Sequence, residues 1–190
     1  ERSKTLRSVS VMLEWGPTVN IGDDTERFAG AIGSSGLAGA LGVQPALGRW
    51  FTPDECQTDG NLTTVVMSDK VWRERFHADR EILGRPLQIN GRQRTIVGVM
   101  PAGFRFPENA DFYVPFAMND TSGNGRGGRY HNGYARLAPG ATRAQAQAEL
   151  DALSRELAHD FPQTNDKVRL LATPYAEAIQ RDIRPILIVL

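Results

Sequence analysis

The dipeptide Asn90-Gly91 constrains the fold more than any other feature of this sequence. It lies between two segments of β-strand character, Pro86–Ile89 and Arg92–Val99. A two-residue type I′ turn needs positive φ at both of its central positions, and Asn-Gly is the pair that adopts this turn most readily. The sequence therefore predicts an antiparallel hairpin over Arg85–Val99.

A strand and a helix are predicted directly before this hairpin. Thr63–Met67 is rich in β-branched residues, which is typical of a buried strand. Ser68 follows at an N-cap position, and Val71, Trp72 and Phe76 continue at helical spacing. Together with the hairpin, these segments form a β-α-β-β unit.

A second helix is predicted from Thr142 onward. Thr142 and Gln145 have the spacing of a capping box, in which each residue satisfies a backbone N–H of the first turn. An apolar stripe follows on one face, and Pro162 ends the helix. The stripe consists of Ala146, Leu150, Leu153, Leu157 and Phe161. Segments of strand character precede and follow this helix, at 131–140 and Val168–Tyr175.

The other segments give weaker signals. Prolines in Phe104–Pro107 and Phe112–Phe116 favour short edge segments over central strands. Small polar residues in Asn119–Gly128 indicate a flexible connector. The N-terminal part is expected to contain a helix over Glu1–Met12, paired strands at Thr18–Ile21 and Arg27–Ile32, and a helix over Leu37–Leu41 with Ser34 or Ser35 as N-cap and Gly42 as C-cap. The predicted fold class is α+β with two subdomains.

Charge and composition exclude several kinds of site. Lys plus Arg and Asp plus Glu both number 22, so the chain lacks the basic surplus of a nucleic-acid-binding domain. Cys56 is the only cysteine, and we interpret it as a bystander in a polar loop. The three histidines, His77, His131 and His159, lack the spacing of a zinc site. We expect no metal, no cofactor and no nucleic-acid partner.

Three local patterns superficially resemble functional motifs. Gly123–Gly128 lacks the Gly-Lys-Ser/Thr of a phosphate-binding loop, and a linker is the simpler interpretation. Asp23, Asp24 and Glu26 lack the spacing of a calcium loop and fit an acidic hairpin turn. No local motif groups a nucleophile with a base, so we expect neither an enzyme nor any catalytic residue.

An ordered set of segments resembles a known family. These segments are LGVQPALGRWFTPDE (41–55), VVMSDKVWRERFHADREILGRPLQINGRQRTIVGVMPAGFRFP (65–107), DFYVPF (111–116) and ARLAPGATRAQAQAELDALSREL (135–157). The set is similar to the MacB-like periplasmic core domain of ABC transporter permeases in the MacB/FtsX-like superfamily, especially the duplicated permeases of acidobacteria. The resemblance extends from about Phe28 to Leu190.

The resemblance implies a particular domain organisation. A porter-like α/β subdomain would comprise residues 1–50 and 117–180, and a small α/β insert of the Sabre type would comprise 51–116. The apolar end of the chain, Arg184–Leu190, would then belong to the start of a transmembrane helix over 181–190.

The resemblance also implies a function. The chain would be a non-catalytic periplasmic domain of an inner-membrane permease, coupling cytoplasmic ATP hydrolysis to export or to force transmission. Implied partners are an ABC ATPase domain or subunit, a second permease copy in a dimer or pseudo-dimer, a periplasmic adaptor, and the membrane through flanking helices. We expect partner contacts at the Asn90-Gly91 hairpin and the loop Gly103–Asn109. Two alternatives are a stand-alone secreted module that binds peptide or glycan, and an extracytoplasmic hydrolase.

Overall fold

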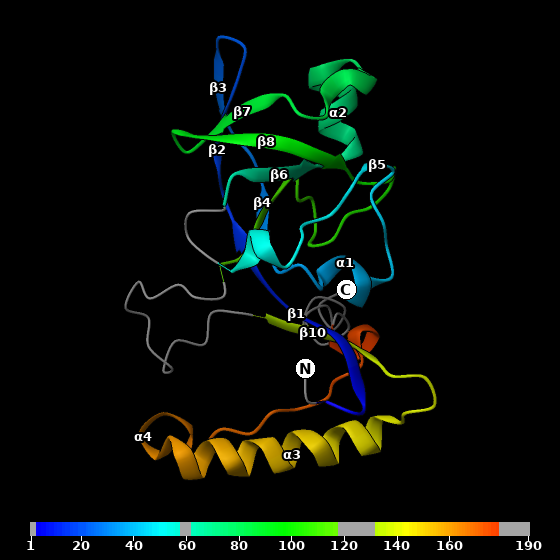
Figure 1. The fold of residues 1–190 in the computed structure, drawn as a ribbon, viewed down its shortest axis with the longest axis vertical. Helices are drawn as coiled ribbons and strands as arrows, with labels where there is room; N and C mark the ends of the chain where they lie inside the picture. The colour runs from blue at the N-terminus through cyan, green and yellow to red at the C-terminus, as the bar shows by residue number, and fades with distance from the viewer. Residues whose placement is uncertain (1–2, 58–61, 118–131, 179–190) are drawn as a thin grey trace, which may run out of the picture. The chain divides into compact units, whose positions relative to one another are not determined.

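The computed structural model describes residues 3–57, 62–117 and 132–178. The chain divides into two compact units, which we describe separately (Figure 1). We call Arg7–Arg136 the sheet unit, and residues 1–6 together with 137–190 the helix unit.

The sheet contains ten strands, in the order β10-β1-β4-β9-β6-β8-β7-β2-β3, and β5 also pairs with β8. The strands are β1 (Leu6–Trp15), β2 (Thr18–Ile21), β3 (Asp24–Arg27), β4 (Gly30–Gly33), β5 (Leu47–Gly48), β6 (Thr64–Met67), β7 (Pro86–Ile89), β8 (Arg92–Val99), β9 (Phe112–Pro115) and β10 (Asn132–Leu137). The helices are α1 (Leu37–Leu41), α2 (Asp69–Phe76), α3 (Arg143–Asp160) and α4 (Pro162–Asn165), with 3-10 turns at Asp54–Cys56 and Arg80–Ile82.

The predicted β-α-β-β unit is confirmed. Asn90 and Gly91 have φ values of 49° and 73°, as a type I′ turn requires, and they join β7 to β8 in antiparallel register. The side chain of Ser68 accepts a hydrogen bond from the backbone N–H of Val71 and caps α2. β6 is buried along its whole length and pairs in parallel with β8.

Both faces of the sheet are covered. On one face, Val71 of α2 packs with Val65, Met67, Ile96 and Phe112. On the other, Leu37 of α1 packs with Met12, Trp50, Phe51 and Tyr113. The sheet unit therefore has an apolar layer on each side, in agreement with the predicted α+β class.

The predicted N-terminal helix is wrong, because this segment forms β1. The alternating burial along β1 has a period of two, and Ser10 and Met12 are its buried positions. Met12 to Trp15 pair antiparallel with Gly33 to Gly30 of β4. Sheet pairing therefore overrides the helical pattern on which the expected helix over Glu1–Met12 was based, with Leu6, Val9 and Leu13 near helical spacing.

Two predictions on neighbouring strands are also wrong. The partner of β2 is Asp24–Arg27 rather than Arg27–Ile32, because the turn at Gly22-Asp23 is only two residues long. Phe112–Pro115 is not an edge segment: β9 lies between β4 and β6 and is fully buried. Pro115 is tolerated there because it is the last residue of β9, beyond the two positions that pair with β6.

Neither Ser34 nor Ser35 caps α1. The N-cap is Gly36, which provides no side-chain hydrogen bond. The hydroxyl of Ser34 instead accepts a hydrogen bond from the N–H of Val11 at 3.1 Å and so holds β1. Gly42 is the C-cap, with φ of 70°, as predicted.

The helix unit is built around α3. Its capping box between Thr142 and Gln145 is present as predicted. The predicted stripe is correct at the buried Ala146 but wrong at Leu153, which is 42% exposed. Ser154 is buried on α3 in addition to Ala146. The predicted strand Val168–Tyr175 does not form: the chain runs along α3 without joining a sheet (Figure 1).

Some predictions fall outside what the structure tests. The connector Asn119–Gly128 and the transmembrane start at 181–190 lie outside the described residues. The subdomain bounds at 50/51 and 116/117 stay predictions, although strands from both sides of residue 50 share one sheet. Within the described part of the chain, no helix is long and apolar enough to cross a membrane.

Candidate functional site

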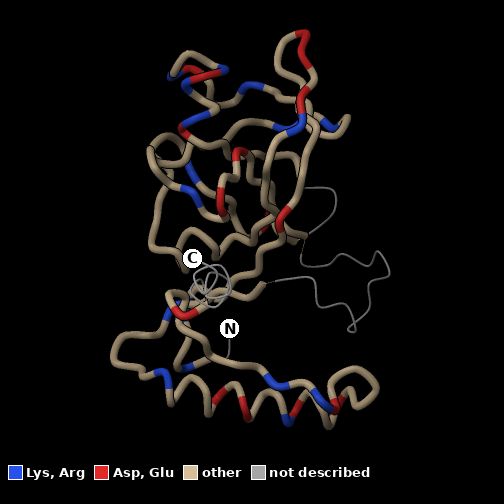
Figure 2. Tube along the Cα trace, turned by 180° about the vertical axis from the view of Figure 1, so that it is seen from behind, with Lys and Arg blue, Asp and Glu red and all other residues tan. Residues whose placement is uncertain are grey.

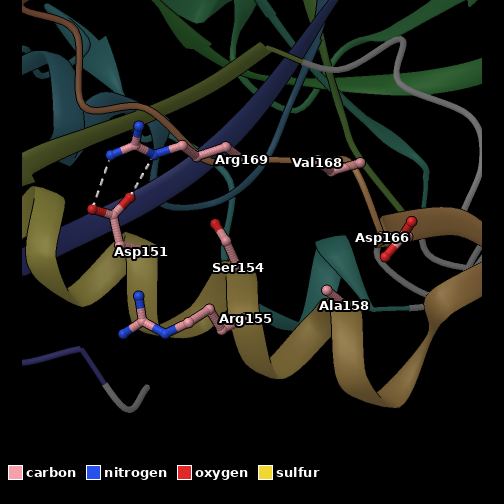
Figure 3. Close-up of a pocket in the computed structure, with 7 residues that line it drawn as sticks. All are labelled: Asp151, Ser154, Arg155, Ala158, Asp166, Val168 and Arg169. Carbon is pink, nitrogen blue, oxygen red and sulfur yellow. Dashed lines mark hydrogen bonds and ion pairs between the residues drawn. The ribbon is translucent and has the colours of Figure 1, made fainter.

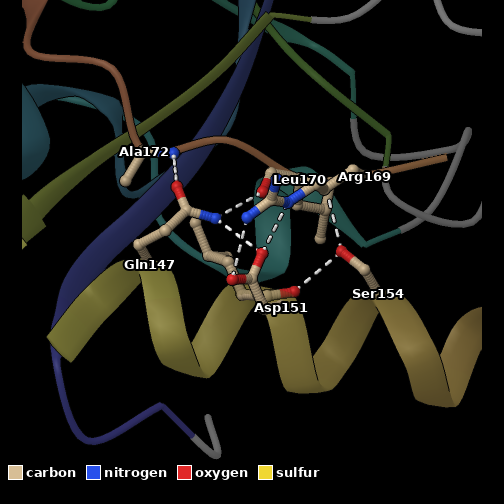
Figure 4. Close-up of polar contacts among 7 residues, drawn as sticks. Gln147, Asp151, Ser154, Arg169, Leu170 and Ala172 are labelled. Atoms are coloured by element: carbon tan, nitrogen blue, oxygen red, sulfur yellow. Dashed lines mark hydrogen bonds and ion pairs between the residues drawn. The ribbon is translucent and has the colours of Figure 1, made fainter. Parts of the chain in front are cut away.

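The strongest polar constellation in the helix unit lies on one face of α3. Gln147, Asp151 and Ser154 are spaced four and three residues apart, which places their side chains in one row along the helix. Figure 4 shows this row pointing toward the extended segment that follows α4. We call Val168–Pro174 the returning segment.

The row on α3 binds the backbone of the returning segment. The amide of Gln147 donates to the carbonyl of Leu170 at 3.0 Å and accepts from the N–H of Ala172 at 2.8 Å. The hydroxyl of Ser154 accepts from the N–H of Leu170 at 3.0 Å. Arg143 donates to the carbonyl of Ala172 at 3.1 Å. Side chains of α3 thus take the place of a neighbouring strand.

An ion pair adds to this attachment. Arg169 makes two hydrogen bonds to the carboxylate of Asp151, at 2.8 and 3.1 Å (Figure 3). Hydrogen bonds from Arg169 and then from Gln147 hold the pKa of Asp151 below its usual range. The side chain of Arg169 is 65% exposed, so the pair contributes little to stability by itself.

A pocket of about 280 Å³ opens beside this attachment. Its lining residues are Asp151, Ser154, Arg155, Ala158, Asp166, Val168 and Arg169. Figure 3 shows the Asp151–Arg169 pair at one end of the pocket and Asp166 at the other. The lining contains two acidic residues, Asp151 and Asp166, and two basic residues, Arg155 and Arg169. Figure 2 shows that charges of both signs are interspersed along α3.

The N-terminal residues are also held by α3. The carboxylate of Glu149 accepts hydrogen bonds from the hydroxyl of Thr5 at 2.6 Å, from its N–H at 3.1 Å, and from the N–H of Lys4 at 3.3 Å. Hydrogen bonds from Thr5 and then Ser3 hold the pKa of Glu149 below its usual range. One helix therefore binds both the beginning of the chain and the returning segment.

The polar groups of this site bind the chain's own backbone. The hydroxyl of Ser154 donates to the carbonyl of Leu150 at 2.7 Å and accepts from Leu170, so it is engaged on both sides. No histidine lines the pocket. Among the described residues, no group of three or more His, Cys, Asp or Glu could hold a metal ion.

The cysteine and the histidines lie elsewhere. Cys56 is not in a polar loop as predicted; it is buried in the core, and this burial raises the pKa of its thiol. His77 is the left-handed C-cap of α2, and His159 lies beside Asp160 near the end of α3. His131 is outside the described residues.

The two predicted contact regions are part of the sheet unit. Asn90 exchanges hydrogen bonds with the backbone of Thr18, so the β7–β8 hairpin is fixed to β2. In the loop Gly103–Asn109, Phe104 and Phe106 pack against the core. Partner contacts at both regions stay predictions.

Sequence reasoning missed the polar row on α3. The sequence does contain a signal for this row, because Gln147, Asp151 and Ser154 are polar residues at helical spacing beside the apolar stripe. The sequence does not identify the binding partners of this row, because the pattern of Val168–Tyr175 predicts a strand rather than a segment along α3.

Several solved structures of other proteins have a similar architecture. The solved structures include the periplasmic region of MacB from Actinobacillus actinomycetemcomitans, with a TM-score of 0.63 and 16% identity, covering 89% of this chain and 80% of that one. The extracellular domain of the noncanonic ABC-type transporter YknZ from Gram-positive bacteria has a TM-score of 0.59 and 16% identity, covering 83% and 77%. A domain of a permease protein from Porphyromonas gingivalis has a TM-score of 0.55 and 18% identity, covering 94% and 80%. At these identities, the likeness shows the fold.

The sequence comparison shows the family. No curated protein sequence matches the chain. The family model described as the MacB-like periplasmic core domain matches residues 1–153, which is well over half of the chain. This match begins earlier than the resemblance at Phe28 and ends within α3. The chain belongs to the family of MacB-like periplasmic core domains.

Proposed function

We propose that this chain is the extracytoplasmic domain of an ABC-type permease and couples cytoplasmic ATP hydrolysis to export or force transmission. The proposed partners are an ABC ATPase domain or subunit, a second permease copy, and a periplasmic adaptor. The proposed location is the periplasmic side of an inner membrane, to which flanking helices anchor the chain. The domain itself performs no chemical step.

One observation within the family supports a coupling role. α3 binds residues 4 and 5 through Glu149, and it binds the returning segment through Gln147, Asp151 and Ser154. In a permease with membrane helices before and after this domain, movement of either end would act on the same helix. The dense polar attachment suits transmission of movement better than binding of a small substrate.

A distance measurement in the full-length permease tests this proposal. Spin labels are placed at Glu156→Cys on α3 and Gln93→Cys on β8, two exposed positions in different units. Within this chain, native Cys56 is buried, which limits background labelling, and cysteines elsewhere in the permease are first replaced by serine. We expect the distance distribution to change when the cognate ATPase binds ATP.

The matched control pair lies within one unit. Labels at Asp24→Cys and Gln93→Cys, both exposed and in the same sheet, should keep their distance under all nucleotide conditions. A Glu156–Gln93 distance that also stays constant in the presence of ATP would contradict coupling. A gene without flanking apolar runs would favour the secreted binding module instead.

A further inference from the structure

Arg94 of β8 is a buried cation with few hydrogen-bond partners. Its side chain is 6% exposed, and among the described residues its guanidinium group makes one hydrogen bond, from Nη1 to the carbonyl of Leu62. The guanidinium group has donors for several more, and its buried Nε has no partner. Buried charged groups are normally paired or hydrogen-bonded, so the partner of this group requires an explanation.

A second arginine lies beside Arg94. Side chains alternate along a strand, so Arg92 and Arg94 of β8 lie on the same face of the sheet, about 7 Å apart along the strand. Arg92 is exposed and makes no hydrogen bond or ion pair within the part of the chain that the structure describes. Burial and then the charge of Arg92 lower the pKa of Arg94 to about 10, which supports their proximity.

A free hydroxyl group is expected next to the two arginines. Thr63 directly precedes β6, and its carbonyl accepts a hydrogen bond from the N–H of Thr95 at 2.5 Å, which places Thr63 beside β8. Two residues further along each strand, Val65 pairs with Ile96, and both pack in the apolar layer on the α2 side. The alternation of side chains therefore puts Thr63 on the same face as Arg94. Thr63 is exposed, and its hydroxyl has no hydrogen-bond partner among the described residues.

The acidic side chains of β3 are too far away to neutralise these arginines. β7 and β2 lie between β8 and β3, which corresponds to about 14 Å at about 4.8 Å per strand. Glu26 of β3 also has another partner, because it forms an ion pair with Arg75 of α2. Among the described residues, no carboxylate pairs with Arg92 or Arg94.

We propose that Arg92, Arg94 and the hydroxyl of Thr63 form a binding site for a phosphate group. The planar fork of a guanidinium group matches the oxygens of phosphate and can bind them bidentately. A phosphate monoester carries a charge of about −1.5 to −2 at pH 7 and has three acceptor oxygens. It can therefore compensate both cations and accept from the hydroxyl, whereas a carboxylate has one charge and two oxygens.

The two arginines differ in exposure, which gives them different parts in binding. Arg92 is exposed, so an incoming anion can reach it directly from solvent. The Nη2 of Arg94 makes no hydrogen bond within the described residues and, unlike Nε, is not fully enclosed. Because Arg94 is less hydrated, its contact with an anion is the stronger one. The same oxygens are present in free phosphate and in a phosphate group on a larger molecule.

Urea denaturation with and without phosphate tests the proposal. The chain is unfolded in chloride buffer at pH 7, and again with about 10 mM inorganic phosphate at the same ionic strength. A ligand that binds only the folded state raises the folding equilibrium constant, and a Kd of about 1 mM gives a rise of about tenfold. Arg92→Met and Arg94→Met should each reduce this rise to about twofold or less, because a charge-assisted contact is lost.

Arg105→Met is the matched control. Arg105 is exposed, has no ion pair among the described residues, and lies beyond the opposite end of β8. This variant should keep the tenfold rise. A second measurement follows the site directly: the Nε–H resonance of Arg94, assigned by its absence from the spectrum of Arg94→Met, should shift with phosphate and saturate.

Two further ligands define what the site accepts. Acetate at the same concentration should raise the folding equilibrium constant by no more than about twofold, because it compensates one cation only. Glycerol 3-phosphate separates the two sources of the phosphate group. A rise equal to that with inorganic phosphate supports a phosphate group on a larger molecule, and a rise with inorganic phosphate alone supports the free ion.

Three results would overturn the proposal. An equal rise in the parent, Arg92→Met and Arg94→Met would indicate the general stabilising effect of phosphate as a salt. An equal rise with acetate would show that the site does not select phosphate. Absence of both the rise and the shift of the Arg94 resonance would show that phosphate does not bind there. None of these results depends on the nucleotide-dependent distance measurement, so the two proposals fail separately.

Discussion

Arg94 is a buried residue of the sheet unit whose charge is poorly compensated. It is 6% exposed, its Nε has no hydrogen-bond partner, and one guanidinium nitrogen donates to the carbonyl of Leu62. Burial, together with the charge of Arg92, lowers the pKa of Arg94 to about 10. The folded chain therefore holds a poorly paired cation in its interior, which is unfavourable at neutral pH.

We expect Arg94→Met to raise the free energy of unfolding by about 1 kcal/mol at pH 7, because an apolar side chain of similar length removes the desolvation cost. Urea denaturation measures this change. Burial holds the pKa of Arg94 in the folded chain at about 10, below its value in the unfolded chain, so the unfolded chain keeps this proton to higher pH. The free energy of unfolding of the parent therefore rises above about pH 10, and the difference in this free energy between the parent and Arg94→Met becomes smaller.

Arg92→Met provides the control, because Arg92 is an exposed neighbour. Its free energy of unfolding should change by no more than about 0.5 kcal/mol. A lower free energy of unfolding for Arg94→Met than for the parent would contradict this interpretation.

Tyr113 differs from Arg94, because the hydroxyl of this buried side chain has hydrogen-bond partners. Its ring is completely buried beside Trp50, and its hydroxyl donates to the carbonyls of Phe106 and Ala110, at 2.9 and 3.3 Å. Tyr113→Phe should lower the free energy of unfolding by about 1 kcal/mol, because these buried carbonyls lose their donor. Thermal denaturation checks the result. The half-exposed Tyr175 provides a control, whose change to Phe should have a smaller effect.

At the scale of elements, the attachment of the returning segment to α3 predicts a local change in dynamics. Gln147→Ala removes the acceptor of the Ala172 N–H and should speed hydrogen exchange at that amide about tenfold, which corresponds to about 1.4 kcal/mol. The Leu170 amide, held by Ser154, should change less. Glu156→Ala, at an exposed position of the same helix, is the control and should leave both amides unchanged. Unchanged protection at Ala172 in Gln147→Ala would mean that Gln147 does not hold the segment.

Elements with strong local signals could be predicted from the sequence. The type I′ hairpin, the Ser68 cap and the Thr142 capping box depend on turn and cap chemistry within a few residues, and all three are confirmed. Elements decided by distant partners could not. β1 is a strand because β4 pairs with it, and β9 is central because β4 and β6 flank it. The polar row on α3 required knowing that Val168–Tyr175 lies along the helix rather than in a sheet.

At the level of the whole molecule, the described polar contacts hold the chain's own segments together. The chain has equal numbers of acidic and basic residues, and its described residues contain no group of three or more His, Cys, Asp or Glu that could hold a metal ion. In the helix unit, polar side chains of α3 bind residue 5 and the returning segment. This organisation fits a domain whose part in transport is mechanical, as proposed above.

The side of the membrane on which this domain lies distinguishes a permease domain from a secreted module. The full-length protein carrying Gln93→Cys, on the exposed part of β8, is produced in cells, and spheroplasts are treated with a membrane-impermeant maleimide. In a background from which cysteines outside this chain have been removed, we predict labelling of a membrane-bound protein in intact spheroplasts, at a level that lysis does not increase. The protein without Gln93→Cys should be labelled little, because Cys56 is buried. Labelling only after lysis would contradict an extracytoplasmic location, and recovery of the protein in the secreted fraction would contradict a membrane permease.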